Sequence, residues 1–223
     1  MAADPRPATV ADPLLDSPGV TVRPLSEYAA VLADLDGTLI DSDGPVRRAW
    51  AGFAARHGLD VETVLHAAQG RPARETALEF APGADDEPRR LELAELSDTD
   101  GVAALPGAAA LLAAPLPLAI VTSCTRQLAA VRLAAAGLPV PDTLVTADDV
   151  ARGKPDPEGY LTGARRRDAE PAASVVLEDA PAGVAAGKAA GMTVIAFTTT
   201  YPADALRAAG ADAVFAGPAD LEL

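Results

Sequence analysis

The sequence predicts an α/β fold in which helices cover both faces of a parallel sheet. Short apolar runs without the alternation of a half-exposed strand are typical of strands that are buried on both faces. Helical patterns separate the later runs, as in a doubly wound sheet. A third observation is a long stretch of helical periodicity without a convincing strand. It interrupts the sheet after the first strand and indicates a separate helical domain.

Six apolar runs are the expected strands of this sheet. The first run ends abruptly at Asp34, Asp36 and Gly37. The strands are expected at residues 29–35, 116–123, 142–147, 174–179, 192–199 and 212–216. The helices between the later strands are expected at residues 126–136, 157–167, 180–190 and 202–209.

The chain is expected to have three parts. Residues 1–22 carry four prolines among alanine and aspartate, gain too little from burial to offset the entropy of ordering, and are expected to form a flexible tail. Residues 43–104 are expected to form the helical domain, because their apolar positions follow a helical period and glycines punctuate them. Residues 23–42 and 105–223 then form the α/β core.

Composition narrows the classes of protein that remain. The 223 residues include 18 Lys and Arg against 32 Asp and Glu, and the net charge of −14 disfavours binding to nucleic acid. The single cysteine, Cys124, cannot form an internal disulfide and fits a reducing compartment. No apolar stretch approaches the ~18 residues of a membrane helix, and the first twenty residues lack a signal-peptide pattern. A soluble cytoplasmic protein is expected, whose oligomeric state does not follow from the sequence.

Polar residues follow the expected strands at the sheet edge where parallel sheets bind their ligands. Four of them are carboxylates, which could not share one edge as anions without a cation. Donors that are all oxygen, with no histidine or cysteine, predict magnesium rather than zinc. The set comprises Asp34, Asp36, Thr122, Ser123, Lys154, Glu178 and Asp179.

Four segments in this region resemble, in the right order, the four motifs of the haloacid dehalogenase superfamily. They are DLDGTLIDS at 34–42, VTSCT at 121–125, GKPDPEGY at 153–160 and LEDAPAGVAAGKAAGM at 177–192. The resemblance covers about residues 31–200. It implies a Rossmann-like core with an inserted helical cap, and an enzyme that cleaves a phosphate ester with the help of magnesium.

The resemblance also implies a role for each polar residue. Asp34 is the expected nucleophile, which forms an aspartyl-phosphate, and Asp36 is the expected general acid and base. Thr122 and the backbone around Ser123 are expected to bind phosphoryl oxygens, and Lys154 to supply a fixed positive charge. The implied magnesium ligands are Asp34, the backbone carbonyl of Asp36, Asp179 and, as a ligand or as a neighbour that orients Asp179, Glu178.

Two other functions remain open within this resemblance. β-Phosphoglucomutase-like enzymes also use two aspartates, magnesium and a helical cap, but similar mutases usually carry a histidine twelve residues after the nucleophile. Val46 occupies that position here, which favours hydrolysis over phosphoryl transfer between sugars. A phosphate-binding protein without activity would lack one of the chemical groups, and none of them is missing.

The expected cap carries two candidate substrate residues. Arg71 and Arg74 lie in GRPARETA, which resembles a cap segment of sugar-phosphate and glycerol-phosphate phosphatases. Their guanidinium groups suit an anionic or hydroxyl-rich substrate, although they could instead pair with Glu75 and Glu79 on the surface. The sequence therefore predicts a phosphatase for a small phosphorylated metabolite, a sugar or polyol phosphate.

Overall fold

The computed structural model describes residues 23–223, so the tail predicted at residues 1–22 lies outside the described residues. Six parallel strands form the central sheet in the order β5-β4-β1-β6-β7-β8. Their bounds are β1 Ala30–Ala33, β4 Leu118–Val121, β5 Leu144–Val145, β6 Ser174–Glu178, β7 Thr193–Phe197 and β8 Ala213–Phe215. Each of the six expected runs contains one of these strands, and the predicted fold class is confirmed.

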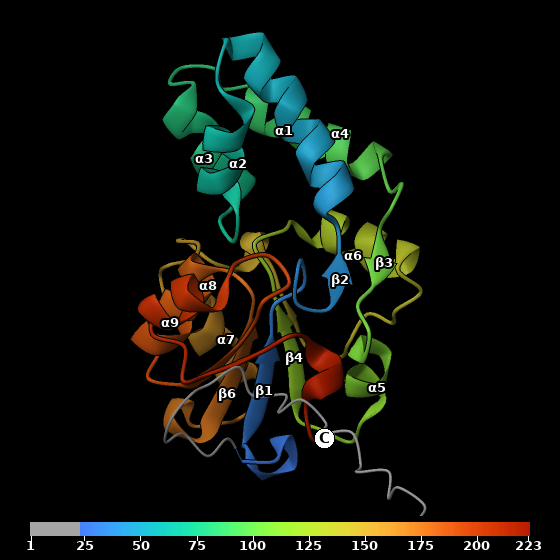
Figure 1. Cartoon of the computed structure of the whole chain (residues 1–223), viewed down its shortest axis with the longest axis vertical. Coiled ribbons are helices and arrows are strands. Elements are labelled where there is room, and N and C mark those ends of the chain that lie inside the picture. The colour runs from blue at the N-terminus through green and yellow to red at the C-terminus, as the bar shows by residue number, and fades with distance from the viewer. Residues whose placement is uncertain (1–22) are drawn as a thin grey trace, which may run out of the picture.

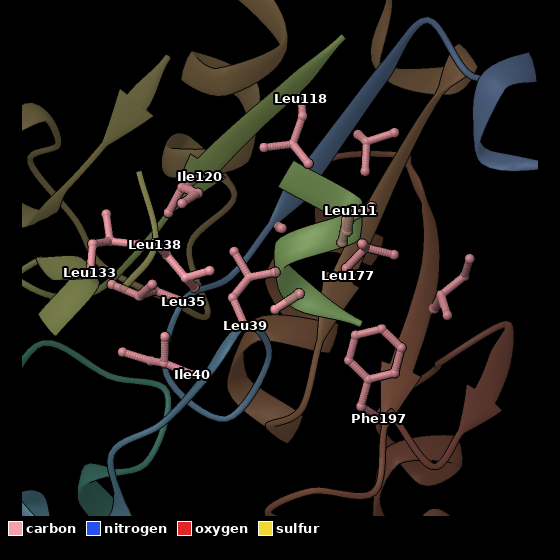
Figure 2. Close-up of a cluster of buried hydrophobic side chains, with 14 of the residues drawn as sticks. Leu35, Leu39, Ile40, Leu111, Leu118, Ile120, Leu133, Leu138, Leu177 and Phe197 are labelled. Atoms are coloured by element: carbon pink, nitrogen blue, oxygen red, sulfur yellow. The ribbon is translucent and has the colours of Figure 1, made fainter. Parts of the chain in front are cut away.

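Both faces of the sheet are covered, which explains the continuous apolar runs. In β1, Val31 and Ala33 belong to one apolar cluster, whereas Ala30 and Leu32 belong to the other. Helices α5 and α6 cover the first face, and Figure 2 shows leucines from both helices packed against strand residues there. Helices α7, α8 and α9 cover the second face. The bounds are α5 Ala108–Ala113, α6 Arg126–Ala135, α7 Glu158–Arg166, α8 Pro181–Ala189 and α9 Ala203–Ala208.

The four helices expected between the later strands are present, and their ends lie within one residue of the predicted positions. The sequence pattern did not predict α5, because its six residues, AAALLA, are too short to show a helical period. A two-stranded antiparallel ribbon of β2 (Ile40–Asp41) and β3 (Ala103–Ala104) was also missed. Two residues per strand are too few to show a hydrophobic pattern in the sequence. The ribbon forms only because two distant segments pair.

Four helices follow β2 and lie beyond the end of the sheet (Figure 1). They are α1 Asp43–His57, α2 Val61–Ala68, α3 Ala73–Phe80 and α4 Glu87–Ser97. They bury an apolar cluster of their own around Trp50, Phe53 and Leu91. We call this helical unit the cap. No helix in residues 23–223 is both long and apolar enough to cross a bilayer.

Candidate active site

The carboxyl ends of β1 and β6 bring the acidic residues together. Asp34 follows β1, and its backbone N–H donates to the carbonyl of Leu177 in β6, 2.9 Å away. Glu178 is the last residue of β6, and Asp179 follows it. The chain continues from β1 to β4 on one side of the sheet and later returns from β5 to β6 on the other. Open parallel sheets bind ligands at this kind of reversal.

A cavity of about 970 Å³ lies over this edge of the sheet. Asp34, Asp36 and Thr122 line it from the core, and Arg71 and Arg74 line it from the cap. The cavity therefore joins the predicted chemical groups with the predicted substrate residues. Its size suits a small molecule rather than a polymer.

Three buried carboxylates form a cluster at the base of this cavity. Oxygens of Asp34, Glu178 and Asp179 all lie within 4.8 Å of one another. Burial raises the pKa of Asp34 well above its usual range. The charge of Lys154 opposes this rise, and the charge of Glu178 adds to it. Burial and Glu178 also raise the pKa of Asp179, to about 7. Like charges held this close are stabilised by a cation.

Lys154 and Glu178 form the buried centre of the cluster. The Lys154 ammonium donates to Asp34 and, at 2.6 Å, to Glu178 Oε1. The Tyr160 hydroxyl donates to the same oxygen at 2.7 Å, and the backbone N–H groups of the next two residues donate to Oε2 at 3.0 and 3.1 Å. Burial disfavours the lysine charge, but both carboxylates outweigh it and raise the pKa of Lys154. Each oxygen of Glu178 is thus engaged with the protein.

The turn after Asp34 needs a glycine. Gly37 has φ = +80°, and a Cβ there would lie 2.0 Å from Oδ2 of Asp179. Only glycine lets the backbone approach that carboxylate in this conformation. Thr38, next in the turn, is buried and donates its hydroxyl to Asp179 Oδ1 at 3.2 Å. The turn therefore orients Asp179 while it carries Asp36 toward the cavity.

Asp36 is held by three side chains that the sequence did not single out for the site. Its Oδ1 accepts from the Ser42 hydroxyl at 2.6 Å and from Arg132 Nη1 at 2.9 Å. Its Oδ2 accepts from the Cys124 thiol at 3.0 Å. Burial, reinforced by Asp36, raises the pKa of that thiol, which keeps it a neutral donor. The other side of Arg132 faces Glu95 of the cap, with Nη2 3.5 Å from Oε2.

The sequence does contain a feature that could have identified Arg132 and Glu95 as buried charges that need a partner. The buried positions of α6 are 128, 129, 132 and 133, so Arg132 stands on the apolar face of its helix. Glu95 lies one turn after the buried Leu91 on the same face of α4. A charged residue on an apolar face needs a partner, although the sequence does not say which one.

Thr122 and Ser123 lie at the end of β4, and both line the cavity. The Thr122 hydroxyl is buried and accepts from the backbone N–H of Cys124 at 3.1 Å. The Ser123 hydroxyl donates to the carbonyl of Gly70 in the cap at 3.0 Å. In this arrangement the Ser123 side chain connects core and cap.

The two cap arginines differ in their partners. Arg71 pairs with Glu79, with Nη2 3.0 Å from Oε2. This is the alternative in which a cap arginine pairs with a surface carboxylate. For Arg74, no carboxylate of residues 23–223 lies within 4.0 Å of its guanidinium nitrogens. Glu75 does not pair with either arginine but accepts from the backbone N–H of Gly153 in the core at 3.2 Å. Among the arginines of the described cap, Arg74 is thus the one that lines the cavity without an acidic partner in the part of the chain that the structure describes.

Known proteins resemble this chain over most of its length. A family model described as haloacid dehalogenase-like hydrolase matches residues 28–191. Hexitol phosphatase A of Escherichia coli (strain K12) is 48% identical over 185 residues, which cover 79% of this chain and 85% of that protein. Validoxylamine A 7'-phosphate phosphatase of Streptomyces hygroscopicus subsp. limoneus is 42% identical over 191 residues, which cover 80% and 90%. The crystal structure of a hydrolase from Pseudomonas syringae has a TM-score of 0.75 at 28% identity and covers 86% and 94%.

Buried carboxylates at the ends of the central strands face a helical cap across a cavity of small-molecule size. The chain belongs to the haloacid dehalogenase-like hydrolase family. The family predicted from the four sequence motifs is thereby confirmed.

Proposed function

We propose that this enzyme hydrolyses a small sugar or polyol phosphate through an aspartyl-phosphate on Asp34. The observation that most supports the proposal is the buried contact of Lys154 with Asp34, which lines the cavity. A carboxylate beside a fixed cation is an oriented nucleophile, and the same cation attracts the phosphate. Asp36, two residues further along the turn, faces the same cavity.

The reaction has two half-reactions. An oxygen of Asp34 attacks phosphorus in line, a new O–P bond forms, and the bond from phosphorus to the ester oxygen breaks. Asp36 protonates the departing alkoxide and becomes a carboxylate. That carboxylate then takes a proton from water, which attacks the aspartyl-phosphate and releases inorganic phosphate and free Asp34. Lys154 keeps its charge throughout and stabilises the charge on the phosphoryl oxygens.

The acidic cluster fits a magnesium ion. Its donors are carboxylate oxygens only, within reach of one another, and burial together with the neighbouring carboxylate Glu178 raises the pKa values of Asp34 and Asp179. A bound magnesium ion would supply electrostatic stabilisation of the phosphate. We assign Asp34 and Asp179, with the backbone carbonyl of Asp36, as its protein ligands. Glu178, whose oxygens accept four hydrogen bonds, orients Lys154 and the residue that follows it.

Three observations support a small polyol or sugar phosphate as substrate. The cavity has a volume of about 970 Å³, and Arg74 in its cap wall has a guanidinium group suited to hydroxyl or phosphate oxygens. Two relatives are named as phosphatases of a hexitol and of validoxylamine A 7'-phosphate. Val46 lines the cavity where similar mutases carry a histidine, and its apolar side chain transfers no proton. Hydrolysis is therefore favoured over mutase chemistry.

Phosphate release in the presence of magnesium tests this function. The panel contains hexitol phosphates, glycerol phosphates, hexose 6-phosphates and β-glucose 1-phosphate, and the sugar isomers are monitored in parallel. We expect free phosphate from one or more polyol or sugar phosphates. Conversion of glucose 1-phosphate to its 6-phosphate with little free phosphate would identify a mutase. Binding of phosphate without turnover of any ester would identify a non-catalytic protein.

Magnesium is expected to stabilise the protein more at high pH than at low pH. The pKa values of Asp34 and Asp179 are raised in the folded state, so the metal-free protein loses stability as pH rises through the range between their unfolded and folded values. The ion binds the charged carboxylates and competes with protons at low pH. Thermal unfolding with and without magnesium at ~pH 6 and ~pH 8 measures this. Equal shifts in Tm at both pH values, or an undiminished shift in Asp179→Asn, would contradict the assignment.

A further inference from the structure

Among residues 23–223, Arg132 joins Asp36 to the cap by charge. It lies on α6 with 3% of its surface exposed. Nη1 is 2.9 Å from Oδ1 of Asp36 and 3.0 Å from the Cys124 sulfur. Nη2 faces Glu95 of α4 at 3.5 Å, and Glu95 is also buried. A buried guanidinium group between two carboxylates is held in position by both of them.

The two oxygens of Asp36 have unequal partners. Oδ1 accepts a charged donor from Arg132 and a hydroxyl from Ser42. Oδ2 accepts only the Cys124 thiol among the described side chains, and a thiol is a weak donor. Arg132 therefore holds one oxygen and leaves the other as the atom that is easily freed for proton transfer.

Glu95 places this arrangement under the influence of the cap. Helix α4 of the cap packs against α6 of the core, and the ion pair of Glu95 with Arg132 crosses that contact. A shift of α4 would move Glu95, and through its contact with Arg132 would change the orientation of Asp36. The path runs from Glu95 through Arg132 to Asp36, and each of these side chains contacts the next in space.

We propose that Arg132 is a positioning residue for Asp36, and that Glu95 connects this positioning to the cap. The inference rests on the proposed role of Asp36 as acid and base. It adds that the proton is transferred at Oδ2, and that the efficiency of the transfer depends on the contact between α4 and α6.

The test compares two esters that differ in their need for an acid. An alkyl phosphate, the best substrate of the panel above, releases an alkoxide that must be protonated, whereas p-nitrophenyl phosphate releases a stable phenolate. In Arg132→Gln we expect kcat/KM for the alkyl ester to fall by about a hundredfold, and kcat/KM for p-nitrophenyl phosphate to fall by only a few fold. Arg126→Gln, an exposed arginine on the same helix, is the matched control and is expected to leave both values unchanged.

Equal losses for the two esters would show that Arg132 is merely structural and would overturn the proposal. If the wild-type protein hydrolyses neither ester, the proposed function itself fails, and this inference fails with it. Arg132→Lys serves where Arg132→Gln does not fold, because lysine keeps the charge but lacks the fork that reaches two carboxylates. We expect the same selective loss for the alkyl ester in that variant, and an unselective loss would overturn the proposal.

The contribution of the cap is measured with a double-mutant cycle. Glu95→Gln alone is expected to lower kcat/KM for the alkyl ester by about tenfold, less than Arg132→Gln, because Asp36 still has its direct partner. Glu95→Gln added to Arg132→Gln is expected to cause no further loss, since Glu95 acts through Arg132. Independent, multiplying losses would show that Glu95 does not act through Arg132.

Discussion

Replacement of Asp34 by asparagine is expected to abolish turnover without unfolding the protein. The amide removes the attacking oxygen anion, so kcat should fall by at least about a thousandfold. Asp34 is buried beside two other carboxylates, the neutral amide relieves that repulsion, and Lys154 still has Glu178 as its charged partner. In the absence of a divalent ion, Tm should therefore stay equal or rise. Phosphate release and thermal unfolding of the same sample measure both effects.

Asp85→Asn is the matched control for this variant. Asp85 is exposed in the loop between α3 and α4, outside the cavity. The same change of carboxylate to amide there is expected to leave kcat unchanged. Turnover of the Asp34→Asn protein at a rate comparable to wild type would exclude Asp34 as the nucleophile, and with it the aspartyl-phosphate route.

Replacement of Lys154 by methionine is expected to damage both folding and catalysis. Lys154 is the buried cation in contact with Asp34 and Glu178, and its loss leaves these two buried carboxylates without their positive counter-charge. Removing one partner of a buried ion pair costs about 3 to 5 kcal/mol in free energy of unfolding. Loss of the fixed charge at the phosphate should also lower kcat by about a hundredfold or more. Urea unfolding at neutral pH and phosphate release measure the two effects.

The sequence contains one other lysine, which provides the matched control. Lys188 pairs with Asp212 near the surface, with 38% of its side chain exposed. Lys188→Met removes the same charge but should change the free energy of unfolding by less than about 1 kcal/mol, because exposed ion pairs contribute little. If the Lys154 and Lys188 variants are equally stable and active, Lys154 is not the central cation of the site.

The local pattern of apolar and polar residues was sufficient to predict the strands of the sheet and the polar residues at its edge. The strands of the sheet are buried on both faces. Each strand is therefore a continuous apolar run in the sequence, and the run stops at the next polar residue. Because parallel strands bring their carboxyl ends to one edge, Asp34 and Asp179 could be placed together from the sequence, and the structure does so within 4.8 Å. The ribbon of β2 and β3 has no such apolar run in the sequence, because it forms by pairing of two distant segments and not from a repeating hydrophobic pattern.

The family, the fold class and the identity of the candidate chemical groups follow from the amino-acid sequence, since they depend on short segments whose residues are read in order. The partners of those groups are known only from the folded structure. Asp36 and Arg132 are 96 residues apart, and Ser123 and Gly70 are 53 residues apart, yet both pairs form hydrogen bonds. The first contact lies within the core, and the second joins the core to the cap. Side-chain packing between distant segments has no period or motif, so only the folded chain decides which partner each buried charge meets.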